Sequence, residues 1–227
     1  VTDSVSAEAD GAAFGLVAGA TTFGFELSGA SLALALGPLA NASADEVLVR
    51  YTDGSTTVAA GTTLTVGAVS YTFAEAIAPG TAAFVAEGFG AEIDGFVTLA
   101  GDLAFARVGD ELVAVGSGVS ATLAVTDSVS AEAAGADFGL VAGATAFGFE
   151  LSGASLTLAL GPLANASADE VLVRYTDGST TVAAGTTLTV GAVAYTFAEA
   201  IAPGTAAFAA EGFGAEIDDF VTLTGDL

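Results

Sequence analysis

The chain repeats itself after 124 residues. The segment Val1–Ala9 returns as Val125–Ala133, and residues 125–227 match residues 1–103 at all but 8 positions. Such near identity predicts two tandem structural units, residues 1–124 and the remainder, and not one domain with a unique core. The second unit lacks the last 21 residues of the period. We therefore expect that both ends of the sequence continue a longer periodic chain.

The junction between the units has the alternating pattern of a β-strand. Over Ala121–Ala133, apolar residues such as Leu123, Val125 and Val129 alternate with threonine, serine or alanine. Period-two alternation is typical of a half-buried strand, whereas a flexible tether would be polar and unpatterned. The pattern predicts one strand through the boundary. Backbone pairing would then pass from unit to unit and make the chain a stiff rod.

The rest of each unit also has strand patterns. Phe23 and Phe25 alternate with Thr, Gly and Glu, and the abundance of β-branched residues, Phe and Gly favours sheet over helix. Gly29 is expected to break or bulge its strand, and Asp53-Gly54 predicts a two-residue hairpin turn. We expect an all-β fold of tandem antiparallel β repeats, sandwich-like or β-solenoid-like, joined into an elongated rod.

Differences between the two units give a second prediction about strand faces. Thr22, Ala33, Ser70 and Val85 differ from their counterparts, and each has parity opposite to an adjacent Phe, Leu or Tyr. A one-residue step reverses the face of a strand. We therefore predict that these four positions face solvent.

The charge composition argues against several classes of partner. The chain has 27 acidic residues, three arginines and no lysine, and a formal net charge of −24. Nucleic acid binding needs cationic groups against phosphate, and an anionic membrane surface would also repel this chain. No apolar run reaches the roughly 20 residues of a membrane helix. We expect neither nucleic acid binding nor membrane insertion.

Catalysis is poorly supported by the residue types present. His, Cys and Lys are absent, which removes Ser-His and Cys-His pairs, Schiff bases, disulfides and thiolate metal sites. A carboxylate pair can hydrolyse a glycoside, but most acidic residues lie in predicted glycine-rich turns. We expect that the chain is not an enzyme, and we keep a carboxylate-based glycosidase as an alternative.

Acidic residues in and near the predicted turns are candidate calcium ligands. Ca²⁺ takes carboxylate and carbonyl oxygens, often from loops, although the sequence contains no EF-hand loop and no Gly-Gly-x-Gly-x-Asp run. The alternative is a solvated acidic surface, and we expect no other cofactor. The candidate ligands are Asp3, Asp45, Glu46, Asp53, Asp94, Asp102, Asp110, Glu111, Asp127, Asp169, Glu170, Asp177, Asp218, Asp219 and Asp226.

Two asparagines match the N-glycosylation acceptor pattern. Asn41 and Asn165 are each followed by Ala-Ser, so both are candidate glycosylation sites. The alternative is that each asparagine supplies turn geometry after the preceding Gly-Pro.

Several short runs of the repeat resemble a known group of bacterial proteins. The runs are Gly101–Ala106, Glu111–Val119 and Phe14–Val17. They are similar to repeats of giant, acidic, secreted surface proteins, the tandem-repeat exoproteins and RTX-type adhesins of Gram-negative bacteria. The resemblance implies an extracellular, cell-surface, β-rich stalk that is sometimes stiffened by calcium. The chain lacks the calcium-binding nonapeptides of RTX tails.

These observations predict a structural role. We expect a repeat region of a long extracellular surface fibre or adhesin stalk, which bears load and associates with further copies of the same repeat through strand pairing. One alternative is a binding module whose apolar β groove accepts a lipid or a glycan, and the other is the glycosidase. An open groove lined by Phe and Leu would favour the binding module.

Overall fold

The computed structural model describes residues 5–36, 40–126, 128–144, 146–218 and 220–227. Within these residues no helix is long and apolar enough to cross a membrane. The secondary structure consists of strands. The strands are β1 (Val5–Asp10), β2 (Ala13–Ala18), β3 (Phe23–Leu36), β4 (Ala40–Thr52), β5 (Thr63–Val66), β6 (Val69–Thr72), β7 (Thr81–Ile93), β8 (Val97–Val108), β9 (Glu111–Thr126), β10 (Val129–Ala142), β11 (Phe147–Leu160), β12 (Ala164–Thr176), β13 (Thr187–Val190), β14 (Val193–Thr196), β15 (Ala206–Glu211), β16 (Phe213–Ile217) and β17 (Val221–Gly225).

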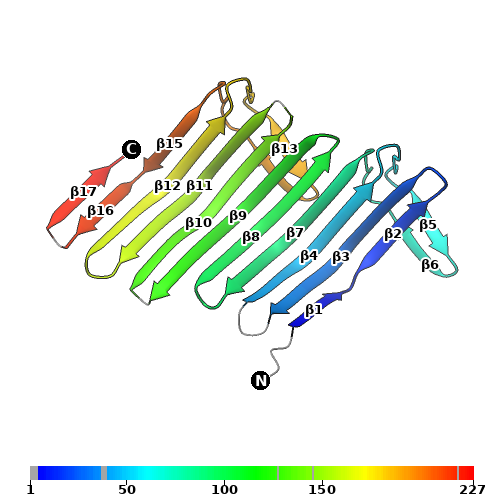
Figure 1. The fold of residues 1–227 in the computed structure, drawn as a ribbon, viewed down its shortest axis with the longest axis horizontal. Helices are drawn as coiled ribbons and strands as arrows, with labels where there is room; N and C mark the ends of the chain where they lie inside the picture. The colour runs from blue at the N-terminus through cyan, green and yellow to red at the C-terminus, as the bar shows by residue number, and fades with distance from the viewer. Residues whose placement is uncertain (1–4, 37–39, 127, 145, 219) are drawn as a thin grey trace.

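Thirteen of the strands form one continuous antiparallel sheet (Figure 1). The order is β1-β3-β4-β7-β8-β9-β10-β11-β12-β16-β17, with β2 continuing β1 along β3 and β15 preceding β16 along β12. β1 and β17 lie at opposite edges of this sheet. The predicted all-β, antiparallel class is confirmed. The sequence left a sandwich and a solenoid open, and the structure has instead one open sheet, while the rod stays a prediction.

The boundary between the repeats lies inside this sheet. β9 contains the boundary and pairs antiparallel with β10, from Leu112 opposite Ala142 to Thr126 opposite Val129. Backbone pairing therefore passes directly from the first repeat into the second, as predicted. The prediction of a single strand over Ala121–Ala133 is wrong, because the chain reverses between β9 and β10. Its alternating pattern belongs to the two paired arms of a hairpin, and both arms have period two.

Glycine bulges interrupt many of the strand pairs. The register shifts in the β3–β4, β7–β8, β8–β9, β9–β10 and β11–β12 pairs. Gly29, Gly88 and Gly118 have φ of 68°, 59° and 58°, a left-handed conformation that glycine adopts without steric cost. The N–H groups of Gly88 and Gly118 donate to the carboxylates of Asp102 and Asp137, each at 2.8 Å. A break or a bulge was expected at Gly29, and the structure has a bulge within the continuous strand β3.

In each repeat, one segment leaves the sheet as a small hairpin. Hairpin 1 is residues 53–80, which contain β5 and β6, and hairpin 2 is residues 177–204, which contain β13 and β14. The two-residue turn predicted at Asp53-Gly54 is wrong, because β4 pairs with β7 and not with the next segment. The Asp53 carboxylate accepts the N–H groups of Ser55 and Thr56, at 3.0 and 2.8 Å, and this Asx turn directs the chain out of the sheet.

Candidate functional site

Hairpin 2 of the second repeat packs on strands of the first repeat. Its two arms lie against β7, β8, β9 and β10. One buried cluster joins Val85, Ala104 and Val115, from three strands of the first repeat, to side chains of the hairpin. The hairpin side chains are Val182, Val190, Val193, Tyr195, Phe197 and Ile201. The second repeat therefore covers part of one face of the first, over β7, β8 and β9.

Glycines let the hairpin approach the sheet closely. A Cβ atom at Gly139 of β10 would lie 2.4 Å from Cδ1 of Tyr195, and one at Gly191 of the hairpin would lie 2.7 Å from Cγ2 of Val85. Both distances are well below the usual contact between carbon atoms. The aromatic and aliphatic side chains of this interface can therefore lie directly on backbone.

The packing of hairpin 2 on the sheet corrects one prediction about which strand positions face solvent. Val85 was predicted to face solvent, but its exposed fraction is 1%, because hairpin 2 lies over it. Thr22, Ala33 and Ser70 are exposed, as predicted. Strand parity separates the two faces of a sheet, but it does not say which face another element covers.

A hydrogen-bond network around a buried ion pair anchors hairpin 2 to the sheet. Glu150 of β11 is buried and accepts hydrogen bonds from Nε of Arg174 on β12 and from the hydroxyl of Tyr195, the latter at 2.7 Å. Arg174 also donates to Glu199 at 2.7 Å, and the Ser152 hydroxyl lies 3.0 Å from that of Tyr195. Tyr195 and Glu199 belong to the hairpin. The network therefore joins the hairpin to two neighbouring strands.

The first repeat has the same network. Glu26 is bonded by Arg50 at 2.5 Å and by the hydroxyl of Tyr71 at 2.7 Å, and Arg50 also bonds Glu75 at 2.6 Å. Burial raises the pKa of Tyr71 to about 12; the Glu26 carboxylate adds to this shift, and the hydrogen bond with Ser28 opposes it. Both oxygens of Glu26 are occupied within the protein. This carboxylate therefore suits a structural ion pair better than attack on a substrate.

The candidate calcium ligands are distributed over turns and strands. Asp3, Asp127 and Asp219 lie outside the described residues. Among the acidic side chains that the structure does place, no group of three or more could hold a metal ion. Calcium binding stays a prediction.

Three of the candidates surround the bulge at Gly88. The Asp45 carboxylate lies 2.4 Å from where a Cβ of Gly88 would be, and Asp102 accepts its N–H. Glu46 lies opposite Glu87 on the neighbouring strand. Burial raises the pKa of Glu87, and the charges of Glu46 and Asp102 raise it further. The second repeat has matching residues at Asp169, Glu170, Gly212 and Asp226, and the Gly212 N–H again donates to Asp226.

The remaining candidates lie at chain reversals. Asp94 and Asp218 have positive φ of 50° and 49° in the turns that precede β8 and β17. Asp110 lies in the turn before β9, 3.7 Å from Arg107, and both side chains are exposed. Glu111 is the exposed first residue of β9. Such exposed ion pairs add little stability.

Asp53 and Asp177 have a clear role as turn caps, and this predicts a pH dependence. Hydrogen bonds from Thr56 and Ser55 lower the pKa of Asp53 to about 2, and Thr180 and Ser179 do the same for Asp177. A lowered carboxyl pKa stabilises the fold above its unfolded-state value of about 4, and this contribution is lost as pH falls towards 2.

We expect the stability difference between the parent chain and a chain with Asp53→Asn and Asp177→Asn to shrink between pH 4 and pH 2. Thermal unfolding followed by circular dichroism at several pH values measures it. The comparison with the variant removes the contribution of the other acidic residues. A difference that is equal at pH 5 and pH 2 would contradict the assignment.

The two glycosylation candidates occupy strands. Asn41 is exposed on β4, opposite Ala35 and Glu92 of the neighbouring strands, and Asn165 is exposed at the matching place on β12. The alternative role in a turn is therefore wrong. Glycosylation stays a prediction.

Comparisons with known proteins found no match, whether with family models, curated proteins or solved structures. The resemblance to bacterial tandem-repeat exoproteins therefore stays an expectation. Evidence on function comes from the packing of one repeat on the other.

Proposed function

We propose that this chain is a structural repeat region of a long extracellular bacterial surface fibre or adhesin stalk, in which copies of the repeat associate through strand pairing. The observation that carries the proposal is the continuity of the sheet. β9 pairs with β10 across the repeat boundary, so both repeats belong to one sheet. Antiparallel edges pair readily with further strands, and additional copies would extend the sheet in the same way.

Hairpin 2 strengthens the junction. It lies on both β9 and β10, and its Tyr195 and Glu199 bond Glu150 of β11 and Arg174 of β12. Burying a large apolar side chain stabilises a fold by about 1.5–3 kcal/mol. Separating the two repeats would therefore break the strand pairing and also expose the apolar cluster under the hairpin. A load-bearing shaft needs such a junction.

The surface charge suits a long extracellular shaft. The net charge of −24 would make neighbouring shafts repel one another and stay soluble. Two of the three arginines, Arg50 and Arg174, are engaged by glutamates of their own repeat. Few cations are therefore left to bridge one acidic shaft to another.

One other function, the binding of a lipid or a glycan, is supported by a groove in the first repeat. It lies between hairpin 1 and β2, has a volume of about 790 Å³ and includes Leu64, Val66 and Tyr71 of the hairpin in its lining. In the second repeat, the hairpin instead packs on β7, β8 and β9. Because protein occupies the matching place there, the structural role is favoured.

Chains of two, three and four complete repeats test the proposed function. Each repeat contributes six strand positions to the sheet, namely the β1/β2 edge, β3, β4, β7, β8 and β9. Strands lie about 4.8 Å apart, so each added repeat should lengthen the particle by roughly 29 Å. Small-angle X-ray scattering and electron microscopy measure the length. Separate compact particles joined at variable angles would contradict the proposal.

A further inference from the structure

The two hairpins have almost the same sequence but different surroundings. Residues 53–80 and 177–204 differ at one position, Ser70 against Ala194. Val66 and Val69 of hairpin 1 are nevertheless 81% and 75% exposed, whereas their counterparts Val190 and Val193 are each 4% exposed. Hairpin 2 lies on strands of the preceding repeat, while hairpin 1 reaches beyond the β1/β2 edge of the sheet (Figure 1).

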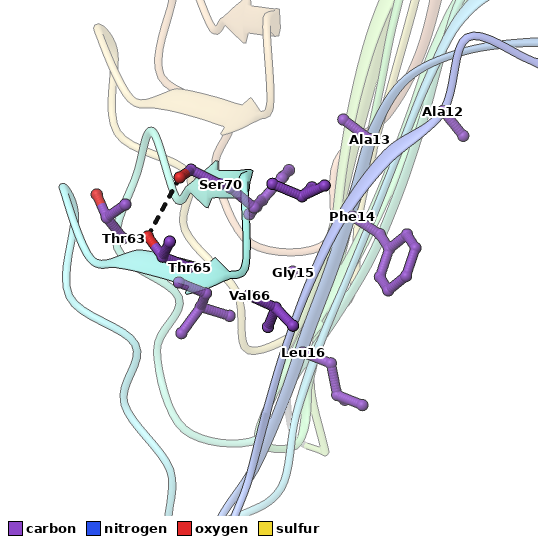
Figure 2. A pocket seen from close by; sticks show the side chains of 12 residues that line it. Ala12, Ala13, Phe14, Gly15, Leu16, Thr63, Thr65, Val66 and Ser70 are labelled. Carbon is purple, nitrogen blue, oxygen red and sulfur yellow. Dashed lines mark hydrogen bonds between the residues drawn. The ribbon is translucent and has the colours of Figure 1, made fainter.

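Hairpin 1 and the edge strand enclose the apolar groove. Figure 2 shows Val66 between the hairpin and β2, while Phe14 and Leu16 point away from the hairpin. Tyr71 lies on Gly15, where a Cβ would be 2.4 Å from Cδ1 of the tyrosine ring. Gly139 and Tyr195 have the same spacing in the second repeat. Hairpin 1 is therefore seated on its own edge strand in the same way as hairpin 2, and only the neighbouring strands differ.

The backbone pairing of the edge strand also indicates a missing neighbour. In the described part of the chain, β1 and β2 pair with β3 on one side only. Their counterpart in the second repeat is β10, which pairs with β11 on one side and with β9 on the other. An edge strand with free N–H and C=O groups is a template for another strand. The uncovered valines and the unpaired edge thus lack the same neighbour.

We propose that this groove and the β1/β2 edge bind the β8–β9 strand pair of another copy of the repeat. The inference rests on the proposed function and specifies the segment through which copies join. The incoming β9 would pair with the β1/β2 edge in the same register in which β9 pairs with β10. This register places Ala114 of the incoming β9 opposite Leu16, and Val113 opposite Val17. Val66 and Val69 would then cover the incoming strands as Val190 and Val193 cover β8 and β9 here.

A single introduced thiol tests the proposal. The chain has no cysteine, so the rate of maleimide labelling of Val66→Cys reports the exposure of this one position. The probe is a synthetic peptide of residues 97–126, which spans β8 and β9. We expect saturating peptide to slow the labelling at least tenfold. The same peptide with Val113→Asp and Val115→Asp is expected to leave the rate unchanged, and Val190→Cys should label slowly without any peptide.

A lengthened chain, with residues 1–124 added ahead of Val1, gives a second measurement that does not depend on peptide solubility. In this chain the thiol at the position of Val66 is expected to label as slowly as Val190→Cys. Selective protection by the unmodified peptide, or protection in the lengthened chain, supports the proposal. Rapid labelling in both formats overturns it, and so does protection by phosphatidylcholine vesicles alone. If lengthened chains still grow by a constant step while the thiol stays reactive, this docking fails and the fibre proposal stands.

Discussion

Replacement of Arg174 by alanine is expected to lower the free energy of unfolding by about 3–5 kcal/mol. The Arg174 guanidinium is the counter-charge of Glu150, whose side chain is 2% exposed. Without it a carboxylate remains buried and uncompensated, and such a group costs several kcal/mol even after the structure relaxes. Urea unfolding of the parent and of Arg174→Ala, followed by circular dichroism, measures the loss.

Two controls separate the buried pair from the rest of the network. Glu199 also bonds Arg174 but is 71% exposed, so Glu199→Ala should cost less than about 1 kcal/mol. Replacing Glu150 and Arg174 together by leucine removes both charges, and we expect it to cost less than Arg174→Leu alone. A loss below about 1 kcal/mol for Arg174→Ala would show that Arg174 is not needed to compensate the buried Glu150 carboxylate.

Local sequence patterns predicted the strand-rich fold, a break or bulge at Gly29 and the continuity of pairing across the boundary. These features depend on alternation and on glycine conformation, which neighbouring residues determine. The chain reversal between Thr126 and Val129 was missed, because both arms of a hairpin continue the same alternation. The departure of the chain from the sheet at Asp53 was missed, because Asp-Gly suits a tight hairpin turn and an Asx turn equally well.

The network at the hairpin was only partly accessible from the sequence. Glu150 and Arg174 are directly opposite each other on β11 and β12. Pairing these two predicted strands in register would have found the ion pair. The contribution of Tyr195 depends on where the hairpin folds, and that is decided by contacts with the preceding repeat. The burial of Val85 has the same origin. Packing between distant segments is therefore what the local pattern could not supply.

A carboxylate introduced on the buried face of hairpin 2 is expected to lower the free energy of unfolding strongly. The same change in hairpin 1 is expected to alter this free energy very little. Val193→Asp would bury a carboxylate among Val85, Val115 and Val190 and remove an apolar contact, with a loss on the order of 4 kcal/mol. Val69→Asp alters the matching residue of the first repeat, which is exposed, and should change stability by less than about 0.5 kcal/mol.

Because the two hairpins differ at one position, this pair of variants compares surroundings and not sequence. Urea unfolding gives the two free energies, and thermolysin cleavage within residues 177–204 shows whether hairpin 2 has left the sheet. We expect rapid cleavage there in Val193→Asp and none above the parent rate in Val69→Asp. Equal losses in the two variants would mean that both hairpins have the same surroundings in solution. That result would contradict the asymmetry on which the docking of another β8–β9 pair depends.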